Sequence, residues 1–179
     1  VASRGLGDVY KRQGDGSAFG CRIRYVKEKE FLGTAGALSL LPPGDRHPLV
    51  VTNGDILTGL DFGSLVDFHD EGAYTATVCA RAHRVEVPYG VIEVRDGCLH
   101  GIVEKPVYDN LISAGIYVLS PAVLPGIPQE QVLDMPDLLL SLVGDGHKIG
   151  VFALEDEWVD VGRHDDLERA KRTFTAPGG

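Results

Sequence analysis

Seven residues, LVVTNGD at positions 49–55, decide the fold class of this chain. Three apolar residues, two of them β-branched, predict a buried strand in the centre of a sheet, and a polar turn containing Gly54 ends that strand abruptly. Asp55 is then expected just past the carboxyl end of the strand, where ligands bind in open α/β sheets. A carboxylate there can hold a Mg²⁺ ion that also binds substrate phosphates, whereas the alternative is a loop aspartate that caps the next turn.

Strands and helices alternate on both sides of this stretch. Asp61 is a good helix N-cap, Asp96-Gly97 between two alternating runs predicts a β-hairpin, and Ser120-Pro121 is typical of a helix start. The alternation indicates an α/β fold, and the inserted hairpin makes its sheet mixed. We expect strands at 21–26, 49–51, 73–82, 89–94, 99–104, 113–119, 148–154 and 158–161, a helix that ends near 41, a short helix from 120, and helices at 61–71, 136–143 and 165–174.

The composition excludes several classes of function. The net charge of −9 argues against non-specific nucleic-acid binding, and no apolar run approaches the roughly 20 residues of a membrane span. The three cysteines are scattered without a CxxC pair, so neither a zinc site nor a disulfide framework is indicated, and a cytoplasmic location is expected. We expect residues 1–13 to be a leader outside the fold, residues 14–175 to form one domain or one piece of a domain, and residues 176–179 to be a tail.

Four charged residues are candidates for chemistry. Asp160 follows a short apolar strand as Asp55 does, so the two carboxylates can bracket one Mg²⁺ if their strands share a sheet; alternatively, Asp160 caps the final helix or pairs with Arg163. Glu104 and Lys105 follow the hairpin, where they suit sugar hydroxyls and a phosphate, respectively, or form a solvated ion pair. The chain has no Gly-x-Ser-x-Gly elbow, no Walker loop and no Gly-x-Gly-x-x-Gly after a strand, which disfavours covalent catalysis and dinucleotide binding.

Six motifs occur in order along the chain: LGTAGAL at 32–38, NGD at 53–55, YGV at 89–91, EKP at 104–106, SAGIY at 113–117 and WVDVG at 158–162. Each alone is modest, but together they resemble the sugar-1-phosphate nucleotidyltransferases, particularly the mannose-1-phosphate guanylyltransferase-like branch. The resemblance spans residues 14–174. It implies a Rossmann-like, GT-A-like mixed sheet flanked by helices, and a reaction in which an NTP, with GTP favoured, and a sugar 1-phosphate give an NDP-sugar and pyrophosphate.

The resemblance also implies roles for individual residues. Asp55 and Asp160 would hold Mg²⁺ and Lys105 would bind the sugar phosphate, so these three are the catalytic candidates. Ser113 stands where the family often has Asn. The implied nucleotide-binding residues are Leu32, Gly33, Thr34, Ala35, Gly36, Asn53 and Gly54, and the implied sugar-phosphate-binding residues are Gly90, Glu104, Lys105, Ser113 and Gly115.

One part of the family pattern does not occur in this sequence. The family begins with a strand and a Gly-x-Gly-Thr-Arg-Leu loop that cradles the triphosphate, followed by Pro-Lys-Pro. We therefore expect the first strand and the phosphate loop to be missing and these 179 residues alone to be inactive. Two alternatives stay open: a non-catalytic nucleotidyltransferase-like subunit that binds a sugar nucleotide, and a GT-A glycosyltransferase, which would usually carry an Asp-x-Asp metal motif. The nucleotide, the sugar and the oligomeric state are also open, a homo-oligomer included.

Overall fold

The computed structural model describes residues 14–42 and 47–161. The strands are β1 (Leu49–Thr52), β2 (Ile56–Thr58), β3 (Ala76–Glu86), β4 (Val91–Arg95), β5 (Cys98–Val103), β6 (Val107–Leu119), β7 (Ile149–Ala153) and β8 (Trp158–Asp160). The α-helices are α2 (Gly33–Gly36), α3 (Phe62–Glu71) and α4 (Met135–Gly144), and the 3₁₀ helices are η1 (Ser17–Phe19), η2 (Ala37–Leu40) and η3 (Pro121–Gly126). Within these ranges, each helix is too short or too polar to pass through a lipid bilayer.

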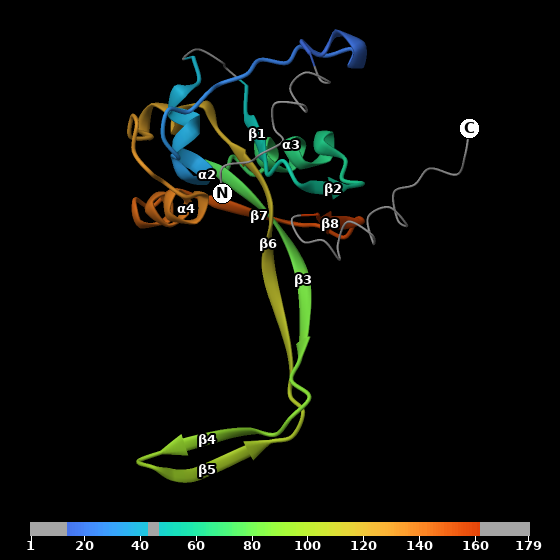
Figure 1. Cartoon of the computed structure of the whole chain (residues 1–179), viewed down its shortest axis with the longest axis vertical. Helices are drawn as coiled ribbons and strands as arrows, with labels where there is room; N and C mark the ends of the chain where they lie inside the picture. Colours follow the sequence, from blue (N-terminus) through green and yellow to red (C-terminus); the bar gives the residue numbers. More distant parts are fainter. Residues whose placement is uncertain (1–13, 43–46, 162–179) are drawn as a thin grey trace, which may run out of the picture.

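The main sheet has four strands in the order β1-β6-β3-β7. β6 pairs antiparallel with both β1 and β3, whereas β3 and β7 run parallel. β2 and β8 form a separate antiparallel pair, and β4 and β5 form the hairpin. Figure 1 shows the β3–β6 ladder running out from the body of the molecule to this hairpin at its far end. The mixed α/β sheet and the inserted hairpin predicted from the sequence are therefore confirmed.

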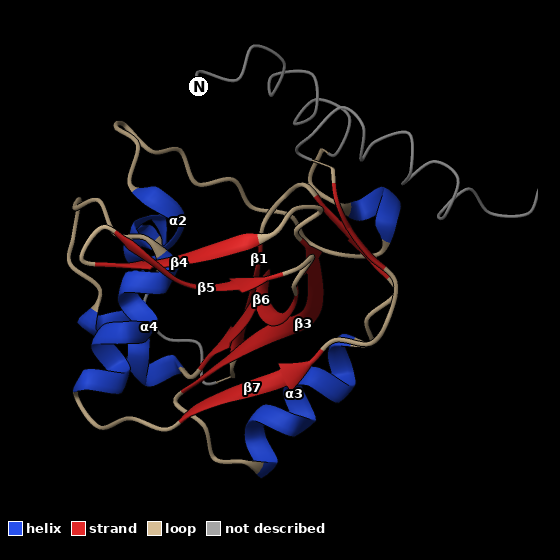
Figure 2. Cartoon of the chain, turned by 90° about the horizontal axis from the view of Figure 1, so that it is seen from below, coloured by secondary structure: helices blue, strands red, loops and turns tan. Residues whose placement is uncertain are grey.

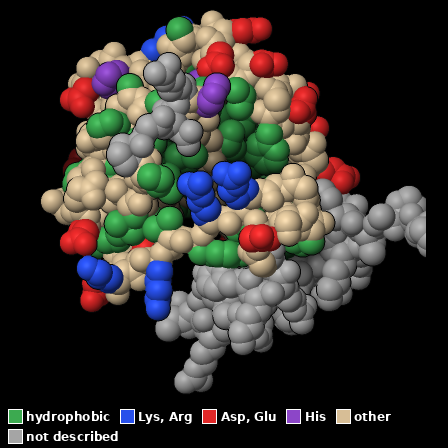
Figure 3. Space-filling view, turned by 90° about the horizontal axis from the view of Figure 1, so that it is seen from above, with side chains coloured by type: hydrophobic (Ala, Val, Ile, Leu, Met, Phe, Trp, Pro, Cys, Tyr) green, Lys and Arg blue, Asp and Glu red, His purple; other side chains and the backbone are tan. Residues whose placement is uncertain are grey.

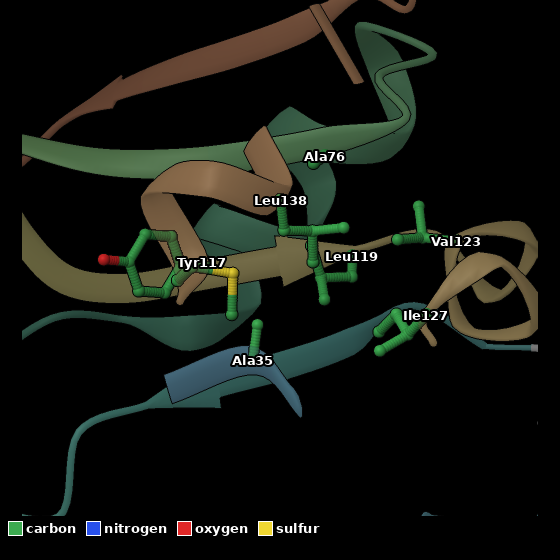
Figure 4. Packing of buried hydrophobic residues seen from close by; sticks show 8 residues of the cluster. Ala35, Ala76, Tyr117, Leu119, Val123, Ile127 and Leu138 are labelled. Carbon is green, nitrogen blue, oxygen red and sulfur yellow. The ribbon is translucent and has the colours of Figure 1, made fainter. Parts of the chain in front are cut away.

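Helices cover both faces of the main sheet (Figure 2). β6 contributes to a core on each face: Tyr117 and Leu119 pack with residues of α4, whereas Ile116 and Val118 pack with residues of α3. This alternation is the side-chain period of a strand that is buried on both sides. Figure 4 shows the first of these cores, with Leu138 of α4 beside Leu119.

Local sequence signals account for where several elements begin and turn. The Asp61 side chain accepts a hydrogen bond from the N–H of Gly63 at 2.9 Å and caps α3, which has the predicted bounds after this cap. Asp96 and Gly97 both have positive φ, 49° and 76°, as a tight two-residue hairpin turn requires. Pro121 stands at the start of η3.

Two predictions about the first third of the chain are wrong. Residues 21–26 alternate apolar and polar side chains, but they form no strand, because no neighbouring strand offers its backbone for pairing within the described ranges. β1 is half-buried and lies at one edge of the described sheet, and β6 and β3 take the central places. The expected leader at 1–13, the helix at 165–174 and the tail at 176–179 lie outside the described residues.

A buried polar network joins α3 to the sheet. His69 is 2% exposed, with Nδ1 2.9 Å from Thr77 Oγ1 and Nε2 3.0 Å from Ser120 Oγ. Ser120 donates its hydroxyl proton to the carbonyl oxygen of Tyr74 at 2.9 Å, so its Oγ accepts from Nε2–H, and Nδ1 accepts from Thr77. Burial lowers the pKa of His69, an effect that the neighbouring Asp70 charge partly opposes. The imidazole is therefore neutral at pH 7.

Candidate functional site

The pairing of β2 with β8 brings the two candidate metal ligands together. Ile56 lies opposite Asp160 in this ladder, and the N–H of Val161 donates to the carbonyl oxygen of Asp55 at 2.8 Å. Asp55 is exposed in the turn after β1, and Asp160 is half-buried. The two aspartates are therefore neighbours across this backbone ladder, and the binding of one cation by both carboxylates stays a prediction.

An open pocket of about 290 Å³ lies beside Asp160. Tyr117 reaches it from the core, and its hydroxyl, which Figure 4 shows directed away from the labelled cluster, lies 3.0 Å from Ser113 Oγ. Four lining residues were predicted from the sequence, namely Asn53, Ser113, Gly115 and Asp160, and five were not, namely Ile56, Ile112, Ala114, Tyr117 and Trp158. The wall thus combines an amide, hydroxyls and a carboxylate with aromatic and aliphatic side chains, a mixture typical of small-molecule sites.

Gly115 shapes this pocket. It interrupts β6 with φ +71°, near the place where the pairing with β3 shifts between Val78 and Ala80. A Cβ on Gly115 would lie 2.7 Å from both Asn53 Nδ2 and Ile56 Cδ1, so a side chain at this position would displace the Asn53 amide. The N–H of Asn53 donates to the carbonyl oxygen of Gly115 at 3.0 Å, which ties the turn after β1 to β6. Irregularities of this kind re-aim side chains beside functional sites.

The segment predicted to line the nucleotide, residues 32–36, packs tightly against residues 131–134. The N–H groups of Ala35 and Gly36 donate to the carbonyl oxygen of Leu133 at 2.9 and 3.0 Å. A Cβ on Gly33 would lie 2.6 Å from that oxygen, and one on Gly36 would collide with the carbonyl oxygen of Gln131. The two glycines therefore permit a close approach of the chain to itself, which is a use that the sequence alone did not indicate.

Thr34 is the exposed residue of this segment and has a structural use of its own. Its N–H donates to Asp134 Oδ1 at 3.0 Å, and its Oγ1 accepts the N–H of Met135 at 2.7 Å. Asp134 occupies the N-cap position of α4 but makes no capping bond with its side chain, so Thr34 caps this helix from a distant part of the chain. A contact of residues 32–36 with a nucleotide stays a prediction.

The sugar-phosphate candidates divide into two groups. Ser113 and Gly115 line the pocket, whereas Gly90, Glu104 and Lys105 flank the β4–β5 hairpin, which lies at the far end of the β3–β6 ladder from β2 and β8 (Figure 1). Gly90 and Glu104 are neighbours there, because a Cβ on Gly90 would lie 3.0 Å from Glu104 Oε2. Lys105 has φ +44°, an uncommon conformation for a residue with a side chain. The structure does not bring these three residues to the two carboxylates.

The carboxylate oxygens of Asp55 and Asp160 are ligands that suit a hard cation, provided that the cation also binds oxygen atoms from other molecules. In the described ranges, no group of three or more His, Cys, Asp or Glu side chains is placed to hold a metal ion. A cation at Asp55 and Asp160 would therefore take its remaining oxygen ligands from phosphates and water, which is how Mg²⁺ is commonly bound. A closed four-ligand zinc site is not formed by these residues.

Trp158 and Arg81 belong to the site but were not predicted from the sequence. Trp158 lines the pocket and donates from Nε1 to the carbonyl oxygen of Ala114 at 2.9 Å. Arg81 Nη1 donates to the carbonyl oxygen of Trp158 at 3.2 Å. A signal for Trp158 existed, since it is the chain's single tryptophan and stands two residues before Asp160. Arg81 carried no such signal, because its contact depends on pairing across the sheet.

Charge on the surface agrees with a ligand that is held locally. On the face seen from above, acidic side chains lie mainly toward the edge of the view, and the basic side chains shown there gather in small groups without an extended patch (Figure 3). Non-specific nucleic-acid binding needs such a patch. With a net charge of −9, a phosphate ligand would depend on a cation or on a few nearby basic groups.

A family model described as "Nucleotidyl transferase" matches residues 7–176. The chain belongs to the nucleotidyl transferase family. This match confirms the resemblance that the six ordered motifs indicated.

The curated relatives agree with it. The chain is 32% identical over 157 residues to the mannose-1-phosphate guanylyltransferase catalytic subunit beta of Danio rerio, and 35% identical over 157 residues to the mannose-1-phosphate guanyltransferase of Debaryomyces hansenii. Each alignment covers 83% of this chain and 43% of the relative, so the chain spans less than half of these proteins.

Two solved structures share the fold of this nucleotidyl transferase chain. One, from Bacillus anthracis, is provisionally named a glucose-1-phosphate thymidylyltransferase and was solved in complex with a sucrose; its TM-score is 0.72 at 24% identity, over 97% of this chain and 74% of that one. The other is HddC from Yersinia pseudotuberculosis complexed with GMP-PN, with a TM-score of 0.64 at 20% identity over 94% and 73%. At these identities the likeness concerns the fold alone, and the Rossmann-like α/β fold is thereby confirmed.

Proposed function

We propose that this chain contributes to the active site of a sugar-1-phosphate nucleotidyltransferase, which forms an NDP-sugar and pyrophosphate from an NTP and a sugar 1-phosphate. The observation that supports the proposal is the pairing of β2 with β8: Asp160 lines the open pocket, and Asp55 is its neighbour across this pair, bonded through its carbonyl oxygen to the N–H of Val161. GTP and mannose 1-phosphate are the favoured substrates, because relatives at 32% and 35% identity are named for mannose-1-phosphate guanylyl transfer.

The chemistry suits a site without a covalent nucleophile. An oxygen of the sugar phosphate attacks the α-phosphorus of the NTP, the bond to the bridging oxygen breaks, and pyrophosphate leaves. Such transfers depend on in-line positioning and charge neutralisation. Asp55 and Asp160 would hold Mg²⁺, which neutralises phosphate charge when it is bound. Asn53 and Ser113 would offer hydrogen bonds to polar groups of the substrates at the pocket wall.

Glu104 and Lys105 enter the proposal through the family resemblance. Since the hairpin lies away from β2 and β8, these residues serve a sugar phosphate in the pocket only if the hairpin approaches it. Lys105→Ala tests this point: we expect the KM for the sugar 1-phosphate to rise while the KM for the NTP stays near that of the wild type. An effect confined to the NTP would contradict the assignment.

The main test is a pyrophosphate-release screen with Mg²⁺ across the four common NTPs and a panel of sugar 1-phosphates. It should use the natural protein in which this chain occurs. In that protein Asp55→Asn and Asp160→Asn should each lower kcat by about 100-fold or more, as the loss of a few kcal/mol of charge stabilisation predicts. Asp156→Asn is the matched control, because Asp156 is an exposed aspartate in the loop before β8. Turnover in either site variant equal to that of the control would refute the metal assignment.

A non-catalytic binding subunit is the second candidate. The observation that favours it is the separation of Lys105 from the two aspartates, because no lysine or arginine is among the described lining residues of the pocket. Calorimetric titration with GDP-mannose distinguishes the two functions. Binding without pyrophosphate release for any substrate pair would support the binding subunit, whereas release would support the enzyme.

A further inference from the structure

β8 is short and needs help to stay against the main sheet. It has three residues and pairs with β2, which is not part of the main sheet. Two side-chain hydrogen bonds cross this gap: Trp158 Nε1 donates to Ala114 of β6, and Arg81 of β3 donates to the backbone of Trp158. The position of the pocket wall at β8 therefore depends on side chains of residues that stand far apart in the sequence.

Arg81 holds Trp158 in two ways. Its Nη1 lies 3.2 Å from the Trp158 carbonyl oxygen, and its Cζ lies over the indole ring, 5.7 Å from the centroid. A guanidinium at this distance is attracted to the face of an indole. Arg81 is half-buried and lies opposite Ile112, which lines the pocket. The Arg81 guanidinium therefore contacts both the backbone carbonyl group and the indole ring of Trp158, a residue of the pocket wall.

The neighbouring arginine of the same strand shows that this contact is specific to one position. Arg84 is exposed and pairs with Asp109 at 3.9 Å across the β3–β6 ladder. The ion pairs found in the described ranges involve Arg84 and Lys29, and none involves Arg81. Arg84 therefore provides a matched control with the same side chain, the same strand and no aromatic partner.

We propose that Arg81 is a positioning residue that fixes Trp158 as a wall of the pocket and thereby sets the affinity of the pocket for the sugar part of its ligand. The second half of this statement rests on the proposed function. Arg81 acts through Trp158 rather than by touching the ligand, since Trp158 lines the pocket and Arg81 does not. Of the implied nucleotide-binding residues, Asn53 lines this pocket and residues 32–36 belong to another segment, so the affinity for the NTP is expected to change less than the affinity for the sugar 1-phosphate.

Trp158 is the single tryptophan of these 179 residues, so the tryptophan fluorescence of this chain by itself reports on Trp158 and makes the first half directly measurable. In Arg81→Met the emission of the ligand-free protein should shift to longer wavelength, and acrylamide should quench it more strongly than in the wild type. Arg81→Lys keeps the charge and should lie between the two. Arg84→Met should match the wild type. The far-UV circular dichroism of each variant establishes that it is folded, so a general loss of stability cannot imitate the shift.

Ligand titrations test the second half. Mannose 1-phosphate and GTP are titrated separately, with Mg²⁺, into the natural protein and its variants. Arg81→Met should weaken mannose 1-phosphate binding about tenfold, as expected for the loss of one charge-assisted hydrogen bond. GTP affinity should stay near that of Arg84→Met. Unchanged emission in Arg81→Met, or an equal loss for both ligands, would overturn the proposal. If the wild type binds neither ligand, the proposed function fails, and the emission data still decide whether Arg81 positions Trp158.

Discussion

Gly115 is the position where one added methyl group should disturb the site most. Gly115→Ala keeps φ at +71° only at a cost, because a left-handed conformation costs a residue with a side chain about 1–2 kcal/mol. The new Cβ would also lie 2.7 Å from Asn53 Nδ2 and from Ile56 Cδ1, and overpacking of this kind costs about 1–3 kcal/mol. The alanine stabilises by about 0.4–1 kcal/mol through the unfolded chain. The free energy of unfolding should fall by about 1–5 kcal/mol.

Gly146→Ala separates the two costs. Gly146 has φ +83°, but a Cβ there would meet nothing within 4 Å, so its substitution carries the conformational cost without the contact. We expect Gly115→Ala to be less stable than Gly146→Ala by about 1–3 kcal/mol, which is the overpacking part alone.

Urea unfolding followed by circular dichroism and by Trp158 fluorescence measures both variants, and coincident transitions would justify a two-state treatment. Equal stabilities of the two variants would show that Asn53 and Ile56 give way freely, and the reasoning about the pocket wall would then be wrong. If Asn53→Ala restores the stability that Gly115→Ala loses, the Asn53 amide is the group that clashes with the new Cβ.

Three further predictions concern His69, Cys79 and Thr34. Burial lowers the pKa of His69, so the unfolded chain binds a proton at this imidazole more readily than the folded chain does. The contribution of neutral His69 to stability is therefore present above about pH 6.5 and is lost as the pH falls below that value. Between pH 7 and pH 5, the urea midpoint should fall more steeply in the wild type than in His69→Gln. Burial raises the pKa of Cys79 to about 12, so a thiol reagent at pH 8 should modify two cysteines of the native chain quickly and the third only in denaturant; the two exposed thiols are Cys21 and Cys98. Thr34→Val removes the distant cap of α4 and should cost about 1–2 kcal/mol, whereas Thr34→Ser should retain most of the stability, as urea midpoints will show.

The elements that the sequence predicted well are those set by neighbours along the chain. Asp61 caps α3 two residues away, and the turn at Asp96 and Gly97 joins two strands that follow each other directly. The family resemblance added the order of the six motifs, from which the chain's family was recognised. For the cap and the turn, the signal and its structural effect lie within a few residues.

The predictions that failed, and the residues that were missed, depend on partners far away in the sequence. Residues 21–26 have the side-chain pattern of a strand, but a strand also needs a second backbone to pair with. The glycines of residues 32–36 are required by the carbonyl oxygens of residues 131 and 133, about a hundred positions later. Arg81 meets Trp158 only because β3, β6 and β8 converge. A single sequence does not state which of its segments will meet, so these contacts could not be derived from it.

The pairing of β2 with β8 also affects the order in which the chain folds. The β3–β6 ladder can grow from the Asp96-Gly97 turn by local steps, whereas β2 and β8 are about a hundred residues apart and share only three residue pairs. Contacts of such long range form late and open early. Native-state hydrogen exchange should therefore reach the Val161 amide, which bonds to Asp55, before the amides in the middle of β6. A cation bound by both carboxylates would stabilise the pairing of β2 with β8, so that cation binding and the formation of this pair would be coupled equilibria.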